Sequence, residues 1–524
     1  MNRFLRRANQ RVSLGSAAAL LAGTSFLGIF LGVLRTKLIN ANFNVFTSDA
    51  YFAAFKIPDL IFFTLASGAL GVAFLPVLSD QLQKSKNAAW DVTSYILNFL
   101  GIIALAASVL LIVFANPLMT YVVAPGFTPE QLELSVAIMR IVSVNIFIFA
   151  ISTILSTVQQ AVGRFFFIAI APLFYNSAII VSIFVFNNSL GVVGLSVGVA
   201  IGAVMQLLVV ALGMVGLKFR YKPSIDFKNK SFIEVLRLLP ARAIDQGIDS
   251  INAIIETRFA SRLVTGSVSW YENALVLHNA PVMLIGNAIS TAAFPRLTEL
   301  LSRGREDLFR KEFVYVLRTM IWIALPVIIV AFFGRAYLAR IIFARSSSEI
   351  AMIFGFLCIA VFFRIIYTLI SRYFYAHKDT KTPLYVSLFV IGLNIFLAYN
   401  LAKPDAYGIV GLALAQSIVA ATEVIILVLI MMRRDPKLFT DLFLQSLIKL
   451  LAVSGFTAVA SFILIQILPL ASSDTGFVLI AKLSIIAFFA FSVHILMSYV
   501  FGLPEAKTVV NKAKRIALGA IKAV

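Results

Sequence analysis

The sequence predicts an all-α polytopic membrane protein with about fourteen transmembrane helices. Residues of the AVILMFWYC set make up 60% of the 524-residue chain, whereas charged residues make up only 13%. Apolar runs of roughly 18 to 25 residues recur from end to end, and each is long enough to cross a hydrocarbon layer of about 30 Å as a helix. The runs lack the alternating pattern that marks the strands of a membrane barrel. Because lipid offers no partner to backbone polar groups, helices are the structure that such runs can form.

The candidate spans are separated by Pro, Gly and charged residues. The apolar run from Ser13 to Leu34 follows a basic start, but it is too long for the core of a signal peptide and is interpreted as the first span. The second, seventh and eighth spans are the least apolar, so a polar pathway is expected there. The spans are predicted to begin near Ser13, Asp49, Trp90, Leu132, Phe165, Gly191, Phe232, Val268, Phe313, Ile350, Pro383, Gly408, Leu442 and Gly476.

Dense clusters of Lys and Arg fall in alternate loops, at residues 218–230, 296–311 and 433–437. The positive-inside rule predicts that these loops are cytoplasmic, and an even number of spans then places both termini in the cytoplasm of a bacterial inner-membrane protein. The excess of 44 basic over 24 acidic residues is attributed to this topology and to contact with anionic membrane lipids, so no nucleic acid partner is predicted. The basic residues between 335 and 345 run against the pattern and are assigned to an interfacial helix.

Comparison of the chain with itself predicts two related halves. Three short motifs recur in the same order at offsets of about 211 to 219 residues, which indicates a duplicated unit of about six helices. The matched motifs are residues 191–195 with 408–412, 171–173 with 382–384, and 74–78 with 293–297. The predicted domains are an N-terminal lobe (1–220), a C-terminal lobe (221–437), a helix pair (438–503) and a basic amphipathic cytoplasmic tail (504–524).

Charged residues in the second span are candidate functional groups, because ionisable side chains inside a membrane are unfavourable unless they face water, a partner or a substrate. Asp49 and Lys56 are seven residues apart and would share one face of a continuous helix. Pro58 predicts a kink in this span. Lys56 either lines a water-filled cavity or takes part in a structural ion pair, with snorkelling of its ammonium group as a third reading.

The first and eighth spans add two further candidates. Arg35 ends the first span after Gly28 and Gly32, whose spacing allows a close approach of helices. Ser269, near the start of the eighth span, can either hydrogen-bond a polar headgroup or serve as a small packing residue.

The seventh span carries Arg242, Asp245, Asp249 and Glu256. Asp245 and Asp249 lie one helical turn apart, so they could bind a coupling cation or join Arg242 in a structural salt-bridge network. Both readings stay open.

Arg140, Arg364 and Glu423 each stand alone in apolar surroundings. For these three residues, burial against a partner on a neighbouring helix is the favoured interpretation.

No catalytic or metal-binding pattern is recognisable. Cys358 is the single cysteine, and the three histidines have no metal-ligand spacing. A P-loop pattern is absent too. The sequence therefore predicts no cofactor and no metal, and it favours a transporter over an enzyme.

Five segments of the sequence carry a family resemblance: residues 48–59, 73–76, 124–127, 266–270 and 381–383. Together they resemble the MurJ/MviN lipid II flippases of the multidrug/oligosaccharidyl-lipid/polysaccharide exporter superfamily. The resemblance implies two lobes around a cationic cavity that accepts the headgroup of an undecaprenyl-diphosphate-linked peptidoglycan precursor, with the lipid tail against the last two helices and membrane potential as the driving force. It also implies contacts with membrane lipids and, as candidate protein partners, proteins of cell-wall synthesis. Arg35, Asp49, Lys56 and Ser269 match positions that the family uses in or near its cavity.

The sequence departs from the family pattern where other members carry cavity arginines. Ile29, Phe62 and Val276 occupy those positions here. Either Arg140, Arg242 or another basic residue compensates for the missing arginines, or the cargo is a different lipid-linked molecule. The alternative functions are a flippase for another polyprenyl-linked saccharide, a cation-coupled antiporter of drugs or amphiphiles that uses the carboxylates of the seventh span, and a scaffold without transport.

Overall fold

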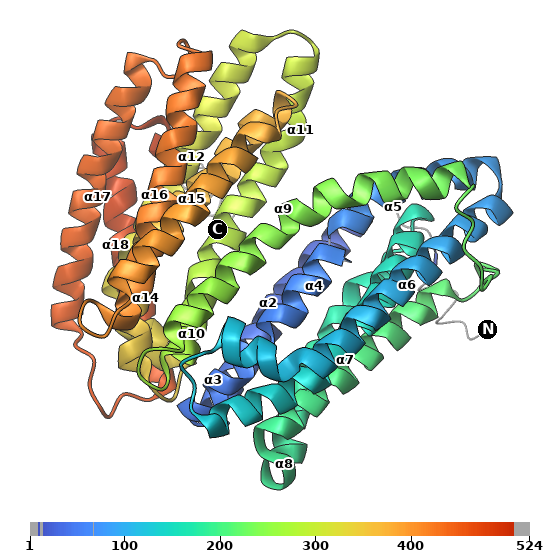
Figure 1. Cartoon of the computed structure of the whole chain (residues 1–524). Helices are drawn as coiled ribbons and strands as arrows, with labels where there is room; N and C mark the ends of the chain where they lie inside the picture. Colours follow the sequence, from blue (N-terminus) through green and yellow to red (C-terminus); the bar gives the residue numbers. More distant parts are fainter. Residues whose placement is uncertain (1–8, 11–13, 66–67, 508–524) are drawn as a thin grey trace, which may run out of the picture. The chain divides into compact units, whose positions relative to one another are not determined.

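The computed structural model describes residues 9–10, 14–65 and 68–507, and within these ranges the secondary structure consists of helices without strands (Figure 1). The predicted tail from residue 508 onward lies outside the described residues. The all-α class predicted from composition is therefore confirmed.

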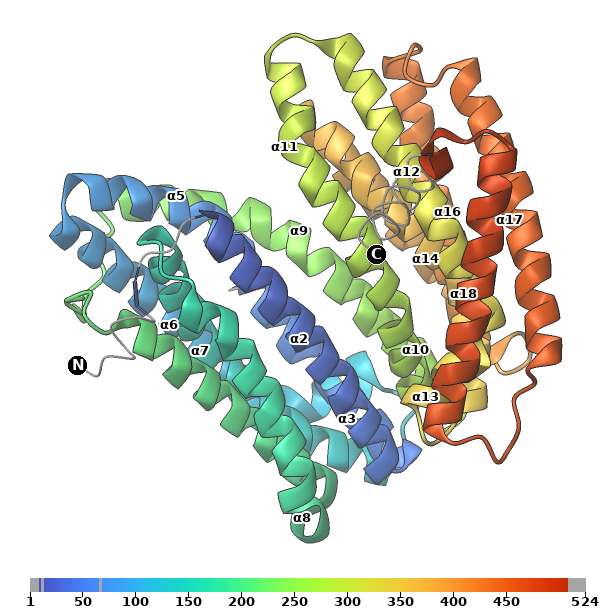
Figure 2. The ribbon, with the colours of Figure 1, turned by 180° about the vertical axis from the view of Figure 1, so that it is seen from behind.

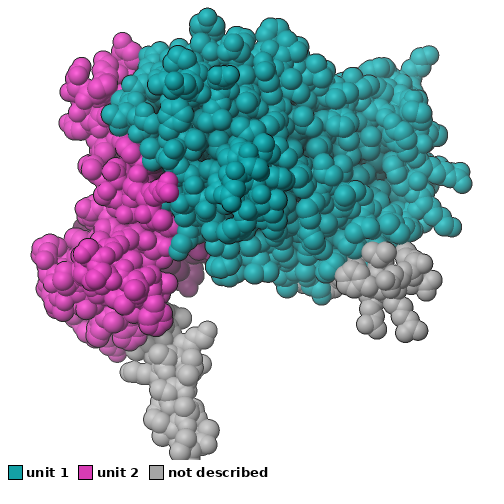
Figure 3. Space-filling view, turned by 90° about the horizontal axis from the view of Figure 1, so that it is seen from below, with its two compact units in different colours: residues 1–269 teal, residues 270–524 magenta. Residues whose placement is uncertain are grey.

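The chain divides into two compact units, residues 1–269 and 270–524, which are coloured teal and magenta in Figure 3. The predicted lobe boundary at residues 220 and 221 stays a prediction. Unit 1 contains α2 (Leu14–Asn42), α3 (Val45–Ala54), α4 (Lys56–Leu65), α5 (Gly68–Lys84), α6 (Lys86–Pro117), η1 (Leu118–Val123), α7 (Pro129–Ala161), α8 (Phe166–Met214), α9 (Lys230–Ala260) and the start of α10 (Ser267–Pro281). Unit 2 contains the rest of α10, then η2 (Val282–Asn287), α11 (Ala288–Ser302), α12 (Glu306–Phe333), α13 (Arg335–Ile342), α14 (Ser347–Ala376), α15 (Lys381–Leu401), α16 (Gly408–Arg434), α17 (Asp441–Ile467) and α18 (Gly476–Val500).

Eleven helical stretches among the described residues are long and apolar enough to cross a membrane. One of them, Phe166–Met214, contains Gly191 with φ 55° and ψ −136°, so its helical path is interrupted where the sequence predicts a new span. The helices α3 to α5 are each shorter than 18 residues and are not counted for that reason. Helix α9 has 31 residues but is too polar to be counted, which agrees with the low hydropathy expected of the seventh span. The chain is thus a multi-pass membrane protein, and the count of fourteen spans stays a prediction.

The predicted internal repeat has a structural counterpart at its best-matched motif. Gly191 and Gly408 both adopt a left-handed conformation, with φ of 55° and 54°. Three residues later, Gly194 and Gly411 each pack against the preceding helical segment with no room for a Cβ atom. One glycine supplies the turn and the other the close approach, and both halves use the pair in the same way.

The glycine pair of the first span does not work as the sequence predicts. A Cβ atom at Gly28 would lie 3.9 Å from the Leu173 side chain of α8, and one at Gly32 would have no atom within 4 Å. Helix α2 packs on α8 without the close backbone contact that GxxxG spacing allows, because its partner presents a leucine side chain at this point.

Helices α17 and α18 pack against each other and against α12 and α13 in unit 2 (Figures 1 and 2). Their mutual contacts include a hydrogen bond of 3.0 Å between Thr457 Oγ1 and His494 Nδ1. Large apolar side chains such as Phe477 and Phe488 remain exposed, as expected for surfaces that face lipid. The short helix α13 confirms the predicted helix at the basic segment, and its Arg340 donates to the carbonyl of Ala471 at 2.7 Å. A lipid-tail groove at this helix pair stays a prediction.

The repeated glycine motif leads to a stability prediction. A Cβ atom at Gly411 would lie 2.8 Å from the backbone nitrogen of Ala402 and against the Leu401 carbonyl, so Gly411→Ala forces backbone to move. We expect a loss of about 1–3 kcal/mol of stability, measured as a lower melting temperature of the protein in detergent. The control is Gly392→Ala on α15, where a Cβ atom meets nothing within 4 Å and where melting should stay equal or rise. Equal melting of both variants would contradict the packing argument.

Candidate functional site

The second predicted span is divided, and this decides where its charges lie. Helix α3 ends at Ala54 and α4 begins at Lys56. Pro58 lacks the N–H that would bond to the Ala54 carbonyl, which explains the break and confirms the predicted kink. Asp49 and Lys56 therefore belong to two successive helices, and their common face stays a prediction.

The Asp49 carboxylate is 2% exposed and binds the start of α10. Its two oxygens accept hydrogen bonds from the backbone N–H groups of Gly266, at 2.6 Å, and Ser269, at 2.7 Å. Such donors at a helix N-terminus carry partial positive charge and have no partner within the helix, so an acidic side chain stabilises them. The Ser269 hydroxyl donates to the Gly266 carbonyl at 3.1 Å. Asp49 and Ser269 are thus brought together at a joint between α3 and α10.

Arg35 lies in the part of α2 that is apolar enough to cross a membrane. Its Nη1 donates to the side-chain oxygen of Asn176 on α8 at 3.1 Å. The guanidinium also interacts electrostatically with the hydroxyls of Tyr51 and Tyr175. The carboxylate of Asp59 acts on the same two hydroxyls with the opposite sign. Among the described residues Arg35 makes no ion pair within 4.0 Å. Its positive charge is held by neutral polar groups.

Helix α4 places Lys56 at its start and Asp59 one turn later, with Lys56 partly exposed and Asp59 exposed. Phe62 follows on the same helix, and its ring centroid lies 5.3 Å from that of Phe149 on α7. An aromatic contact therefore fills this position. Helix α4 packs along α9, where the Cβ position of Gly247 lies 3.2 Å from Thr64 Oγ1.

The side chains of Arg242, Asp245 and Asp249 on α9 lie outside the described residues. Their proposed ion coupling stays a prediction. Glu256, two turns beyond Asp249, is buried and accepts a hydrogen bond of 3.0 Å from Asn252 Nδ2. Near the end of the same helix, Arg258 donates to the carbonyls of Tyr121 and Val122 and so ties α9 to η1.

Unit 2 contains a buried ion pair between neighbouring helices. Arg364 Nη1 of α14 lies 2.9 Å from Glu423 Oε2 of α16, and the Glu423 side chain is 3% exposed. Ser387 of α15 donates to the other carboxylate oxygen at 2.8 Å. A partner on another helix is confirmed for both residues, with Glu423 buried and Arg364 partly buried. Arg140 differs, because its side chain is exposed and its Nε donates to the Ile112 carbonyl of α6 at 3.3 Å.

Helix α10 carries buried polar atoms that have no hydrogen-bond partner among the described residues: Ser267 Oγ, Trp270 Nε1, Asn273 Oδ1 and His278 Nε2. At 3.6 residues per turn these four positions fall within an arc of about 140°. Unpaired polar groups in a membrane protein are unfavourable, which makes this face a place where a polar ligand would gain hydrogen bonds. The low hydropathy of the eighth span predicted a polar segment, but spacing alone did not identify these four atoms or predict the electrostatic influence of Arg364 on His278.

The Lys381–Pro383 motif begins α15 beside an acidic residue of the preceding loop. Asp379 accepts hydrogen bonds from the backbone N–H groups of Lys381 and Thr382, each at 3.0 Å, and from Arg434 of α16 at 2.6 Å. Burial raises the pKa of this carboxyl, but the hydrogen bonds from Thr382 and Arg434 outweigh burial and hold the pKa well below its usual range. The motif therefore serves as a charged cap that joins two helices.

A family model described as lipid II flippase MurJ matches residues 42–487. Named relatives include a probable lipid II flippase MurJ of Borreliella burgdorferi, which is 26% identical over 423 residues, or 79% of this chain and 83% of the relative. A protein of the same name from Thermotoga maritima is 27% identical over 417 residues, or 78% of this chain and 83% of the relative.

Solved structures agree on the fold. A lipid II flippase MurJ in an inward closed conformation has a TM-score of 0.78 and 23% identity, with 92% of this chain and 98% of that chain covered. An inward-facing multidrug resistance transporter of the MATE family, within the MOP superfamily, has a TM-score of 0.66 and 17% identity, covering 78% of this chain and 95% of its own. At these identities the structures show a common fold alone.

The Asp49 joint can be tested by substitution. Asp49→Ala leaves the N–H groups of Gly266 and Ser269 without acceptors. We therefore expect the free energy of unfolding to fall by about 1–3 kcal/mol and the melting temperature in detergent to fall with it. Asp49→Asn keeps one acceptor oxygen and should fall between Ala and wild type. Asp405→Ala, at an exposed loop carboxylate, is the control and should melt like wild type. If Asp49→Ala melts at the same temperature as wild type, the Asp49 hydrogen bonds do not stabilise the contact between α3 and α10.

The ion pair of unit 2 gives a separate test. Arg364→Met leaves the buried Glu423 carboxylate without its cation, and we expect a loss of about 3 kcal/mol or more of stability. Arg364→Met combined with Glu423→Gln removes both charges and should recover at least half of the loss, again measured by thermal unfolding in detergent. If the double variant is no more stable than Arg364→Met, the two residues do not act as a pair.

Proposed function

Since this chain belongs to the lipid II flippase MurJ family, we propose that it moves an undecaprenyl-diphosphate-linked peptidoglycan precursor from the cytoplasmic to the outer leaflet of the membrane. The protein acts as a transporter, and no covalent bond of the lipid changes. Alternating access between two states would carry the polar headgroup across while the polyprenyl tail stays in the membrane.

The observation that carries this proposal is the environment of Arg35. A guanidinium in a membrane-spanning helix is normally matched by a carboxylate, yet the hydrogen bond of Arg35 goes to the neutral Asn176 amide. Its charge is therefore available to an anion. A diphosphate needs fixed cations to offset the hydration that it loses in the membrane, and guanidinium binds phosphate oxygens through two parallel hydrogen bonds.

We assign complementary roles to the other three predicted residues. Lys56, at the start of α4, would supply a second cation to the diphosphate. Asp49 and Ser269 would act by position, since both are engaged at the joint between α3 and the start of α10. The unpaired polar atoms of α10 would bind the sugar and peptide part of the headgroup when the transport cycle exposes them.

Location and driving force follow as parts of the same proposal. The basic loops support a location in the cytoplasmic membrane of a bacterium, with both termini in the cytoplasm. Membrane potential would drive the movement of the anionic headgroup, which the inside-negative potential favours toward the outer face. Glu256 on α9, with Asp245 and Asp249, remains the candidate set for ion coupling.

Complementation tests the proposal. In a bacterium depleted of its own lipid II flippase, we expect the wild-type chain to restore growth. Arg35→Ala and Lys56→Ala should each reduce rescue by at least tenfold in colony count, as expected from the loss of about 1.4 kcal/mol or more of headgroup binding. Arg35→Lys keeps the charge but loses bidentate binding and should rescue in part. Lys86→Ala, at an exposed lysine beginning α6, is the control and should rescue fully.

Membrane levels of each variant are measured in parallel by immunoblot. Failure of a well-inserted wild-type chain to rescue would contradict lipid II as the cargo. It would favour another polyprenyl-linked saccharide, in keeping with Ile29, Phe62 and Val276 at positions where the family carries arginines.

A further inference from the structure

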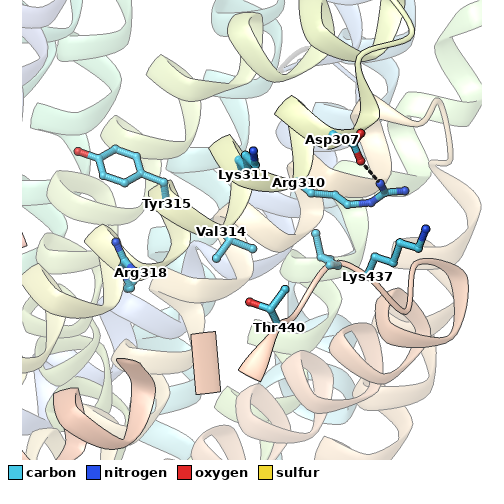
Figure 4. A pocket seen from close by; sticks show the side chains of 9 residues that line it. Asp307, Arg310, Lys311, Val314, Tyr315, Arg318, Lys437 and Thr440 are labelled. Atoms are coloured by element: carbon cyan, nitrogen blue, oxygen red, sulfur yellow. Dashed lines mark hydrogen bonds and ion pairs between the residues drawn. The ribbon is translucent and has the colours of Figure 1, made fainter. Parts of the chain in front are cut away.

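A pocket of about 390 Å³ lies within unit 2, between the first half of α12 and the loop that joins α16 to α17 (Figure 4). Its volume falls within the range of roughly 300–1,000 Å³ that small-ligand sites occupy. Figure 4 shows Arg310 and Lys437 toward one end of the pocket, Tyr315 and Arg318 toward the other, and Val314 and Thr440 between them. None of these residues takes part in the proposed flipping site.

The helix presents its pocket residues as one face. Asp307, Arg310, Lys311, Val314 and Arg318 follow the i, i+3, i+4, i+7 and i+11 spacing, which places side chains along a single stripe of an α-helix. Helix α12 also packs against α17, whose start closes the pocket. The pocket is therefore built from packed helical elements together with a short loop.

The cations of the pocket fall into two classes. Arg310 is held by Glu306, Asp307 and Asp435, and Arg318 is held by Glu505. Lys311 and Lys437 are exposed, and among the described residues neither side chain makes an ion pair. Of the acidic residues named, only Asp307 lines the pocket. The two arginines are thus fixed in place and neutralised by carboxylates. The two lysines carry charges that no carboxylate of the described part of the chain neutralises.

The rest of the lining is apolar or amphipathic. Val314 and the buried Leu438 lie between the cations, and the Tyr315 ring is 52% exposed. Beyond Thr440, the first turns of α17 expose Leu442 and Leu444, at 73% and 57%. Thr440 makes no side-chain hydrogen bond to cap α17, so its hydroxyl is available to a ligand. Cations beside an exposed apolar strip suit a molecule with an anionic head and a hydrocarbon tail.

We propose that this pocket binds the headgroup of an anionic glycerophospholipid, with Lys311 and Lys437 on the phosphate, the Thr440 hydroxyl on the glycerol, and the acyl chains along Leu442 and Leu444. Basic pockets at the ends of membrane helices on the cytoplasmic side bind such headgroups, and the loops on either side are the basic ones that the positive-inside rule places in the cytoplasm. The singly charged phosphodiester matches the pocket better than a diphosphate, because Asp307 and the nearby Asp441 repel additional negative charge.

The first experiment measures thermal unfolding of the full chain in detergent while dioctanoyl phosphatidylglycerol is added. We expect a saturable rise in melting temperature with the wild-type chain. In the Lys311→Gln/Lys437→Gln double variant, the lipid concentration that gives half of this rise should be about ten times higher. The matched control, Lys86→Gln/Lys228→Gln, replaces two exposed lysines elsewhere and should respond like wild type. Dioctanoyl phosphatidylcholine should have no saturable effect.

Two further probes distinguish the source of the phosphate. Inorganic phosphate at the same concentrations should not reproduce the rise; if it does, the pocket is a free-anion site and the lipid proposal is overturned. Farnesyl diphosphate is the second probe. If it raises the melting temperature at a lower concentration than dioctanoyl phosphatidylglycerol does, and if the double lysine variant loses this effect, the assignment to a phosphodiester is overturned.

The second experiment does not depend on the stability of a variant. The wild-type chain is placed in phosphatidylcholine vesicles that contain a tenth of photoreactive phosphatidylglycerol, and the cross-linked peptides are identified by mass spectrometry. We expect cross-links concentrated in residues 307–318 and 437–444. Cross-links spread evenly over the apolar surface of the protein, or an unchanged titration in the double lysine variant, would overturn the proposal.

Discussion

Charge inside the membrane is the constraint on which this structure depends, because an unmatched ionised side chain in hydrocarbon is unfavourable by several kcal/mol. The chain satisfies its intramembrane charges in different ways. Asp49 uses the backbone donors of Gly266 and Ser269, and Glu423 uses Arg364 together with Ser387. Arg35 is bonded to a neutral amide and keeps its charge. This difference separates groups that hold the helices together from a group that can bind a ligand.

The fold was largely predictable from the sequence because its signals are local. Long apolar runs and loop punctuation predicted the helices, and the repeated glycine pairs predicted the likeness of the two halves. Gly191 and Gly408 have φ values within a degree of each other because a left-handed turn needs the same residue in each half. Pro58 likewise marked the break between α3 and α4.

The site was less predictable because its contacts join residues far apart in sequence. Helical periodicity relates Asp49 to Lys56, but it could not predict that the Asp49 carboxylate binds backbone N–H groups more than 200 residues away in the sequence. The Arg364–Glu423 pair shows the same limit: each residue was expected to have a partner, yet spacing alone could not identify it. The Gly28–Gly32 spacing did not predict the helix packing correctly, because a close approach also requires small residues on the partner helix. Helix α8 presents the side chain of Leu173 to Gly28 instead.

The central claim is that Arg35 carries the anionic headgroup of the precursor, and leaflet-resolved detection of the lipid tests it most directly. Cells that depend on this chain are exposed to an external hydrolase that cleaves the lipid-linked precursor only in the outer leaflet, and the cleaved headgroup is quantified for wild type and for Arg35→Ala at equal membrane levels. The account predicts abundant cleavage with wild type and near-background cleavage with Arg35→Ala. Equal cleavage in both would contradict it and would leave Arg35 as a structural partner of Asn176.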